Sequence, residues 1–200
     1  MNFLNFMPDY FIGCDPDTRH AAYAALDREG NVIRAWTKES NGNETIQSNV
    51  HRVIDMDDQH MMDTLGAYLK TSVAAVEGQQ VYRDDKKSNP ADLIKLARSS
   101  GISCAYLSKF VLDIQIVLPN IWKGNRQKHA HQADILTKLG QTPVIKGKGD
   151  HRYAVPKEDF LRLNQTQYKH VIDAIGIAMW LRDSYIWEFK KRGKLKDLNN

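Results

Sequence analysis

Two short apolar runs in this chain each end in a carboxylate. Residues 10–14 suit a buried strand and are followed by Asp15, and residues 73–76 are followed by Glu77. A continuous apolar run of this length is typical of a strand covered on both faces, as in a mostly parallel sheet between helices. An ion at the end of such a strand is costly unless it is neutralised, paired or bound to a metal.

A third segment supplies two more ionisable groups. His170 and Asp173 lie one turn apart in an apolar helical pattern, so they share one face of a predicted helix. In open α/β sheets, sites gather where the carboxyl ends of adjacent strands meet. Carboxylates suit Mg²⁺, a hard cation that prefers oxygen. Four metal-competent groups from three distant segments therefore predict one cation site, of the kind that holds two divalent ions for phosphoryl-transfer chemistry.

Each motif also has a purely structural interpretation. Residues 15–18 form a good turn sequence, and Glu77 before Gly78 could simply end a strand in solvent. His170 and Asp173 could be an exposed polar stripe on an apolar helix. The order and context of the motifs taken together favour the site.

The remaining pattern predicts a three-layer α/β domain. Strands are expected at residues 10–15, 20–26, 32–37, 73–77 and 114–118, with a hairpin turn at Gly30. Helices are expected at 51–69, at 90–99 with Asn89 or Ser88 as the cap and Gly101 as the stop, at 102–112, at 126–139 with Gly140 as the C-cap, and from 156 to 191. Residues 40–48, 79–89 and 142–155 are predicted loops.

Composition narrows the functional classes. Two hundred residues fit one domain, no apolar run reaches membrane-spanning length, and the amino terminus lacks a signal-peptide pattern. Cys14 and Cys104 alone form neither a disulfide framework nor a cysteine zinc site, and are expected to be reduced, mostly buried thiols. The net charge is +4, and the basic residues gather at 123–128, 146–152 and 190–196. This distribution favours a polyanion such as nucleic acid as the partner.

Three segments resemble the motifs of RuvC-type Holliday-junction resolvases. Residues 12–19 look like the first motif, in which a hydrophobic residue is followed by Gly-x-Asp-Pro-Gly. Residues 75–79 look like the second and residues 170–178 like the third, and the likeness spans residues 10–182. The resemblance implies an RNase H-like fold, with a mixed five-stranded sheet and helices on both faces. We expect a resolvase domain at 10–189, an amino-terminal extension at 1–9 and a basic tail at 190–200.

The resemblance also implies a homodimer that cuts four-way or branched DNA with Mg²⁺, for which Mn²⁺ substitutes, without a small-molecule cofactor or a membrane, in the cytoplasm of a bacterial or phage-infected cell. Asp15, Glu77, His170 and Asp173 would hold the metals, with His170 as a ligand or as an acid or base. Lys128 would stabilise phosphate charge, although a solvated lysine fits equally well. The lysine spacing is shorter than in the bacterial pattern, as in phage-encoded relatives. Expected DNA contacts are Lys123, Arg126, Lys128, Lys146, Lys148, Arg152 and Tyr82.

One departure and three alternatives accompany this interpretation. Asp17 stands where the family has Gly, and we expect it to point into solvent rather than toward the metals. An actin-like kinase or ATPase would need a glycine at Asp17 and a longer chain. A proofreading-type exonuclease would need a longer gap between His170 and Asp173. A non-catalytic branched-DNA-binding protein on the same fold is disfavoured because all four ligand candidates are present. His129 and His131, two residues apart on a helix, are expected to be solvated rather than a metal pair.

Overall fold

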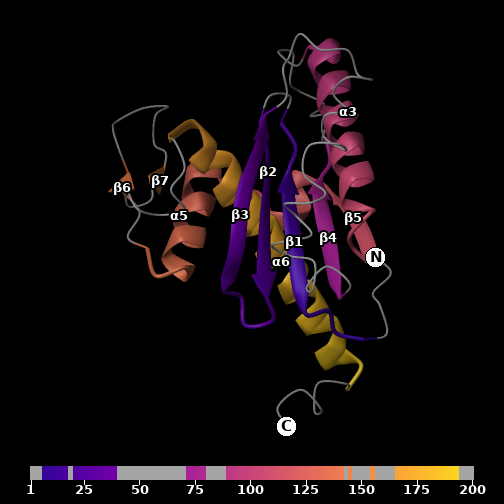
Figure 1. The fold of residues 1–200 in the computed structure, drawn as a ribbon. Helices are drawn as coiled ribbons and strands as arrows, with labels where there is room; N and C mark the ends of the chain where they lie inside the picture. The colour runs from indigo at the N-terminus through magenta and orange to yellow at the C-terminus, as the bar shows by residue number, and fades with distance from the viewer. Residues whose placement is uncertain are drawn as a thin grey trace.

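A mixed sheet of five strands, in the order β3-β2-β1-β4-β5, forms the centre of the computed structural model (Figure 1). The model describes residues 6–17, 20–39, 71–79, 89–141, 144–145, 154–155 and 165–193. β1 pairs antiparallel with β2 and parallel with β4, and β4 pairs parallel with β5. All five predicted strands are confirmed to within two residues at each end: they are β1 (Tyr10–Asp15), β2 (His20–Asp27), β3 (Val32–Glu39), β4 (Ser72–Glu77) and β5 (Asp113–Val117).

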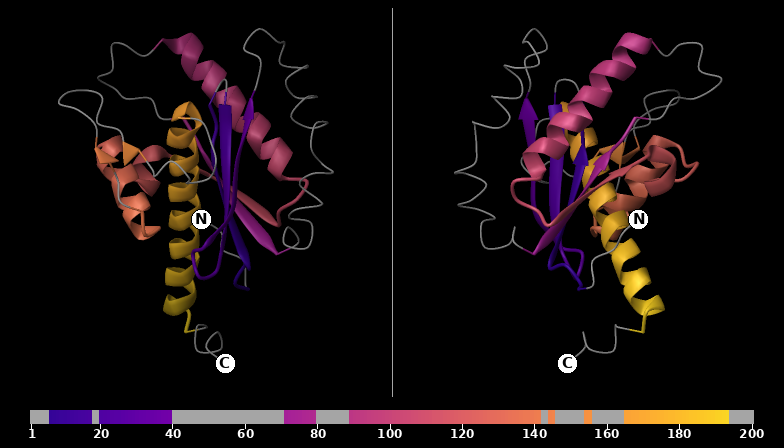
Figure 2. Two further views of the ribbon diagram at one scale, coloured as in Figure 1. Left: turned by 60° about the vertical axis from the view of Figure 1, so that its left-hand side comes forward. Right: turned by 90° about the vertical axis from the view of Figure 1, so that its right-hand side faces the viewer.

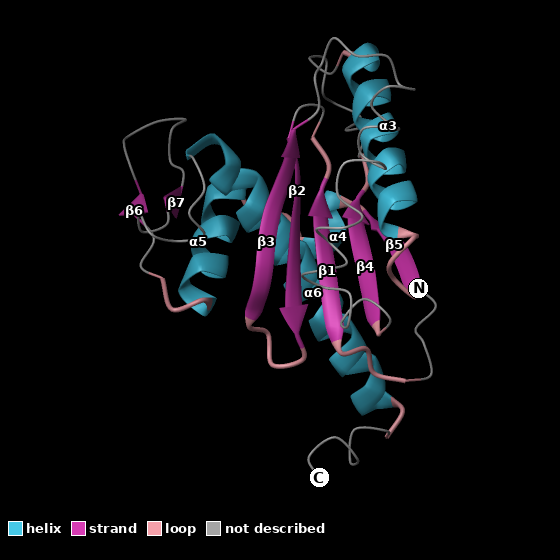
Figure 3. Cartoon of the chain, viewed as in Figure 1, coloured by secondary structure: helices cyan, strands magenta, loops and turns pink. Residues whose placement is uncertain are grey.

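Helices cover both faces of this sheet, which confirms the three-layer prediction. The helix α3 lies on one face and α6 on the other, with α5 outside α6 (Figures 2 and 3). A separate pair of two-residue strands lies beyond α5. The described helices are α3 (Pro90–Leu107), α4 (Pro119–Trp122), α5 (Lys128–Lys138) and α6 (Gln165–Lys191), and the small pair is β6 (Val144–Ile145) and β7 (Ala154–Val155).

The alternation of side chains along β1 builds the core on both faces. Ile12 and Cys14 pack with Tyr106 of α3 on one face, whereas Phe11 packs with α6 on the other. Gly13 lies between these layers, and a side chain there would collide with the backbone of α6 at Ala174 and Ala178. Because residue 13 lacks a side chain, α6 packs directly against β1, and the first turns of α6 lie close to the carboxyl end of the strand.

Several local predictions are confirmed and others are wrong. The Asn89 side chain accepts a hydrogen bond from the Ala91 backbone N–H at 3.0 Å, as expected of a cap. Gly30 and Gly140 have φ of +93° and +70°, as expected for a hairpin turn and a helix end. The predicted stop at Gly101 is wrong, because α3 continues through it to Leu107 and buries Ser103 and Leu107 against the sheet.

The predicted loop at 142–155 contains β6 and β7, and the short helix α4 was not predicted. The predicted helix at 51–69 lies outside the described residues. Cys14 is buried, Cys104 is partly buried, and both are free thiols, as predicted. In the part of the chain that the structure describes, no helix is both long enough and apolar enough to cross a bilayer.

Candidate active site

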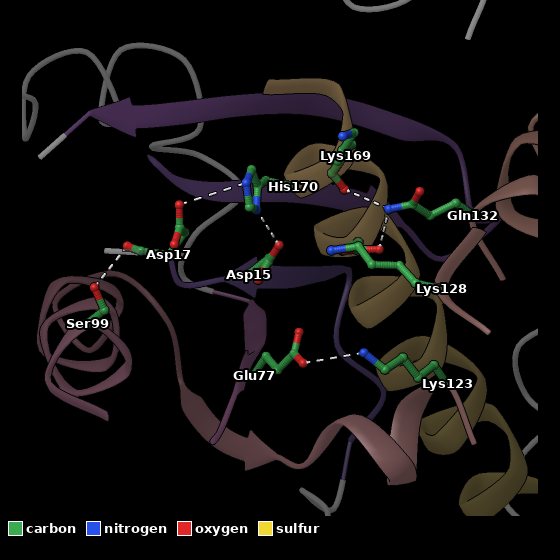
Figure 4. A network of polar contacts seen from close by, with 10 residues as sticks. Asp15, Asp17, Glu77, Ser99, Lys123, Lys128, Gln132, Lys169 and His170 are labelled. Atoms are coloured by element: carbon green, nitrogen blue, oxygen red, sulfur yellow. Dashed lines mark hydrogen bonds and ion pairs between the residues drawn. The ribbon is translucent and has the colours of Figure 1, made fainter. Parts of the chain in front are cut away.

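Asp15 and Glu77 are the last residues of two adjacent parallel strands. Cys14 of β1 is in register with Val76 of β4, so the next residues bring both carboxylates to one edge of the sheet (Figure 4). Each of these side chains is only 14% exposed. The backbone at this edge is fixed from α3, where the Ser100 hydroxyl donates to the Glu77 carbonyl at 3.0 Å.

The imidazole of His170, from the first turns of α6, lies between two carboxylates. Its Nδ1 is 2.9 Å from Asp15 Oδ2, and its Nε2 is 3.8 Å from Asp17 Oδ2. The hydrogen bond to Asp15 raises the pKa of His170 despite partial burial, and the charges of Asp15 and Asp17 add to the effect. The expectation that Asp17 points into solvent is therefore wrong. The Ser99 hydroxyl of α3 also donates to the Asp17 carbonyl at 2.9 Å.

Asp173, one turn further along α6, is the most buried of the four predicted ligands, with a side chain that is 4% exposed. Lys128 Nζ lies 2.6 Å from its Oδ2, and the Gln132 amide donates to its Oδ1 at 2.9 Å. Burial raises the pKa of Asp173 in spite of these partners. Burial lowers the pKa of Lys128, but the charges of Asp173 and Asp15 outweigh it and raise that pKa overall. Both α5 residues therefore hold a carboxylate that the fold withdraws from water.

Glu77 shows that the carboxylates repel one another. Burial, and then the negative charge of Asp15, raise its pKa from 4.5 to about 7, against the opposing effect of Lys123. Lys123 Nζ lies 3.8 Å from Glu77 Oε1. At this edge of the sheet, the carboxylates are only partly neutralised by Lys123, Lys128 and His170.

The structure brings all five predicted catalytic residues together, whereas one predicted DNA contact lies aside. Arg126 is exposed on the rim and pairs with Asp134 at 2.6 Å rather than with the cluster. Tyr82, Lys146, Lys148 and Arg152 lie outside the described residues. The cluster at the carboxyl edge contains Asp15, Glu77, Lys123, Lys128, His170 and Asp173.

Gln132 was not among the predicted site residues, but it is fully buried and its side-chain amide donates to both Asp173 and the Lys169 carbonyl. Its signal was its position four residues after Lys128, on the same face of a helix. The prediction for His131 is wrong, because its ring packs edge-on against Trp122 with centroids 4.9 Å apart. Burial, followed by the charges of Arg126 and Lys123, lowers the pKa of His131 to about 4.

Each of the three carboxylates lies within ion-pair distance of a nitrogen group: Asp15 of His170, Glu77 of Lys123, and Asp173 of Lys128. Within residues 6–193, as far as they are described, no three His, Cys, Asp or Glu side chains form a ready-made ligand cluster. The donor set nevertheless suits Mg²⁺ or Mn²⁺, because three carboxylates supply hard oxygen ligands, and burial together with the charge of Asp15 raises the pKa of Glu77. Lys123 and Lys128 sit on flexible stems that can turn away from the carboxylates. The residues present therefore fit divalent cations.

Comparison with solved structures identifies the fold of the chain. No protein-family model matches the sequence, and no curated protein matches it. Thermus thermophilus RuvC in complex with a Holliday junction substrate superposes with a TM-score of 0.58 at 15% identity, covering 92% of this chain and 97% of RuvC. A second Thermus thermophilus RuvC structure gives a TM-score of 0.53 at 16% identity with the same coverage. The chain has the RNase H-like α/β fold of RuvC.

Proposed function

We propose that this chain is a structure-selective DNA endonuclease that resolves Holliday junctions and other branched DNA by two-metal-ion phosphodiester hydrolysis. The observation that carries the proposal is the acidic cluster on a RuvC-type fold. Asp15, Glu77 and Asp173 reach one edge from three different elements, and burial, followed by repulsion from Asp15, raises the pKa of Glu77 to about 7. A buried excess of carboxylates at a strand edge is the arrangement that attracts divalent cations.

Asp15, Glu77 and Asp173 would hold the metal ions, and His170 would act as a nitrogen ligand or as an acid or base. When bound, Mg²⁺ or Mn²⁺ makes an attacking water more acidic and stabilises the charge that develops on the phosphate. The cleavage products would be a 5′-phosphate and a 3′-hydroxyl.

The protein's own side chains would bind the phosphate, orient the carboxylates and exchange protons. Lys123 and Lys128 lie within ion-pair distance of the carboxylates, so once those are occupied they are free to donate to phosphate oxygens. Gln132 keeps Asp173 in one orientation through the Oδ1 hydrogen bond. The contact of His170 Nδ1 with Asp15 Oδ2 at 2.9 Å orients the ring, and Nε2, 3.8 Å from Asp17 Oδ2, would be the nitrogen that binds a metal or exchanges a proton.

We also propose that the enzyme is a phage-type homodimer acting in the cytoplasm of a bacterial or phage-infected cell. Two active sites related by a two-fold axis match a four-way junction, which is itself two-fold symmetric. Selection of branched DNA would then depend on the spacing of the two sites and on phosphate contacts rather than on base edges. The Thermus RuvC structure in complex with a Holliday junction supports branched DNA as the substrate by fold analogy.

The test is cleavage of matched junction, fork, flap and linear duplex substrates over a range of Mg²⁺ concentrations. We expect paired nicks in the junction, none in EDTA, and resistance of the linear duplex. Equal cutting of the duplex would reject junction selectivity but retain the nuclease. Junction binding without nicks, in the wild type and in Asp15→Asn alike, would favour the non-catalytic DNA-binding alternative.

A further inference from the structure

A groove runs along α6, between this helix and the α4–α5 segment. It has a volume of about 730 Å³. Gly176 lies on its floor, where any side chain would collide with Ile135, Trp122 and His131. The absence of a side chain there lets α4 and α5 pack closely against α6. Figure 2 shows α5 beside the amino-terminal half of α6, whereas the carboxyl-terminal half continues past it.

The far part of the groove is lined by indole rings. Trp180 and Trp187 are seven residues apart on α6, so they lie on one face of the helix, and both line the groove. Trp187 is 61% exposed, which is unusual for the largest apolar side chain. The Lys191 ammonium lies 5.1 Å from the Trp187 ring centroid. Trp180 is partly buried and packs against the core, so this end offers one exposed indole ring, that of Trp187, with a positive charge over it.

The rim of the groove is basic, and its near end meets the cation site. Lys123, Arg126 and Lys138 line it, although Arg126 is paired with Asp134 at 2.6 Å, and Lys123 is the same residue that lies 3.8 Å from Glu77. Asp183, the one carboxylate that lines the groove, is paired with Arg182 at 2.8 Å. From Gly176 to Trp187 the helix rises by about 16 Å, at 1.5 Å per residue. The groove thus leads from Lys123, beside the acidic cluster, to the exposed ring of Trp187.

We propose that this groove binds a short unpaired stretch of the DNA strand that adjoins the scissile phosphate. A base stacks on the exposed ring of Trp187, beside the partly buried Trp180, and the phosphates contact Lys123 and Lys138. A basic groove with successive aromatic side chains is the usual way in which proteins hold single-stranded nucleic acid. Paired bases in a duplex are stacked inside the helix and do not reach such rings. The inference rests on the proposed function, because Lys123 belongs to both sites.

An acidic peptide with aromatic side chains is the other macromolecule whose chemistry suits a basic, apolar groove. Continuity with the cation site favours DNA, because a strand held at Glu77 and Lys123 is already at the mouth of the groove. A peptide partner has no such reason to begin there. The two occupants are separated by the experiment below.

The test measures the affinity of a fluorescent oligothymidylate for the full chain in EDTA, where no cleavage occurs. Trp187→Ala should weaken binding by at least about fivefold, the loss expected for one base–aromatic stack. The matched control is Ile33→Ala on the edge strand β3, an apolar side chain that is 44% exposed and does not line the groove, and it should leave affinity unchanged. Lys138→Gln should lower the slope of log affinity against log salt by about 0.7, whereas Lys95→Gln on α3 should not.

A second measurement tests whether the DNA strand lies in the groove. A four-way junction carrying 5-iodouracil next to the cut site should photocrosslink to Trp180 or Trp187. Unchanged oligothymidylate affinity in Trp187→Ala, with junctions still cut by the wild type, would overturn the groove assignment and leave the nuclease standing. Failure of the wild type to cut or bind any DNA would overturn both. Trp187-dependent binding of a Glu- and Phe-containing peptide but not of oligothymidylate would also overturn it, in favour of a protein partner.

Discussion

Carboxylates lie at both ends of the central sheet, but their hydrogen-bond and ion-pair partners differ between the two ends. At the hairpin end, Asp27 accepts hydrogen bonds from the backbone and side-chain nitrogens of Asn31, both at 2.8 Å. Arg28 pairs with Asp9 at 2.7 Å and also donates to the carbonyls of Met7 and Pro8. Each acid there has donors of its own, fixed by a turn or by a rigid guanidinium.

At the carboxyl edge the acids share their partners and repel one another. Asp15, Glu77 and Asp173 come from three elements, and their counter-charges are two lysines and a histidine from elsewhere in the chain. The pKa values of Glu77 and Asp173 are raised, mainly by burial. The comparison teaches that an acid with local donors stabilises the fold, whereas a buried acid cluster held by flexible lysines is ready to exchange them for cations.

The largest expected difference between the two ends is catalytic. Asp15→Asn should lower junction cleavage by at least about 10³-fold, because it removes a carboxylate that the two-metal mechanism needs. Fold and junction binding should be retained, since asparagine preserves the shape of the side chain. The measurement is single-turnover cleavage in Mg²⁺.

Asp27→Asn is the matched control at the hairpin end, and its cleavage rate should equal that of the wild type. Comparable losses in the two variants would remove the distinction between the ends of the sheet. Thermal unfolding of both variants shows whether a loss of activity reflects a loss of structure.

The next effect concerns the pH dependence of stability in EDTA. The folded-state pKa of Glu77, about 7, lies above the unfolded value of 4.5, so its favourable contribution is complete below pH 4.5 and is lost as the pH rises through 7. Glu77→Gln should therefore be more stable than the wild type at pH 8, by on the order of 2 kcal/mol, and equally stable at pH 4. Urea unfolding at the two pH values measures this. An equal difference in unfolding free energy at pH 4 and pH 8 would show that the fold does not raise the pKa of Glu77.

A smaller effect is expected from removing one cation at each end. Lys128→Met leaves buried Asp173 without its ammonium and should cost about 1 kcal/mol in EDTA, a value reduced by the partial exposure of Lys128. Mg²⁺ should restore the loss by occupying the carboxylates. Arg28→Met should also destabilise the protein, but Mg²⁺ should not restore it. Equal behaviour of the two variants on adding Mg²⁺ would contradict the proposed exchange.

The smallest effect tests Asp17. Asp17→Gly introduces the residue typical of the family and removes the carboxylate that lies 3.8 Å from His170 Nε2. With one negative charge fewer beside the site, the Mg²⁺ concentration for half-maximal cleavage should rise about two- to fivefold. A Mg²⁺ titration of the cleavage rate measures the midpoint. A midpoint equal to that of the wild type would show that the Asp17 side chain does not affect metal binding and serves only in the turn.

Features carried by local pattern could be predicted from the sequence, and features made by packing could not. The apolar runs of β1 and β4, and the acids that end them, were readable because strand burial and strand ends leave a direct signature. The extension of α3 through Gly101 was not, because contacts of Ser103 and Leu107 with the sheet outweigh the weak helix propensity of glycine.

The same distinction applies within the site. The grouping of Asp15, His170 and Asp173 followed from motif order, but the direction of Asp17 depended on how closely α6 packs against Gly13. The roles of Gln132 and His131 depended on which face of α5 meets α6, which a helical pattern of mixed polarity does not specify.

The most direct test of the central claim is a count of Mn²⁺ ions bound by the full chain, measured by electron paramagnetic resonance at pH 8. We predict two ions per chain in the presence of uncut junction DNA, a loss of binding in Asp15→Asn, and wild-type binding in Asp27→Asn. Absence of bound Mn²⁺ in the wild type, or equal binding in Asp15→Asn, would contradict the assignment of the carboxyl edge as a metal-dependent nuclease site.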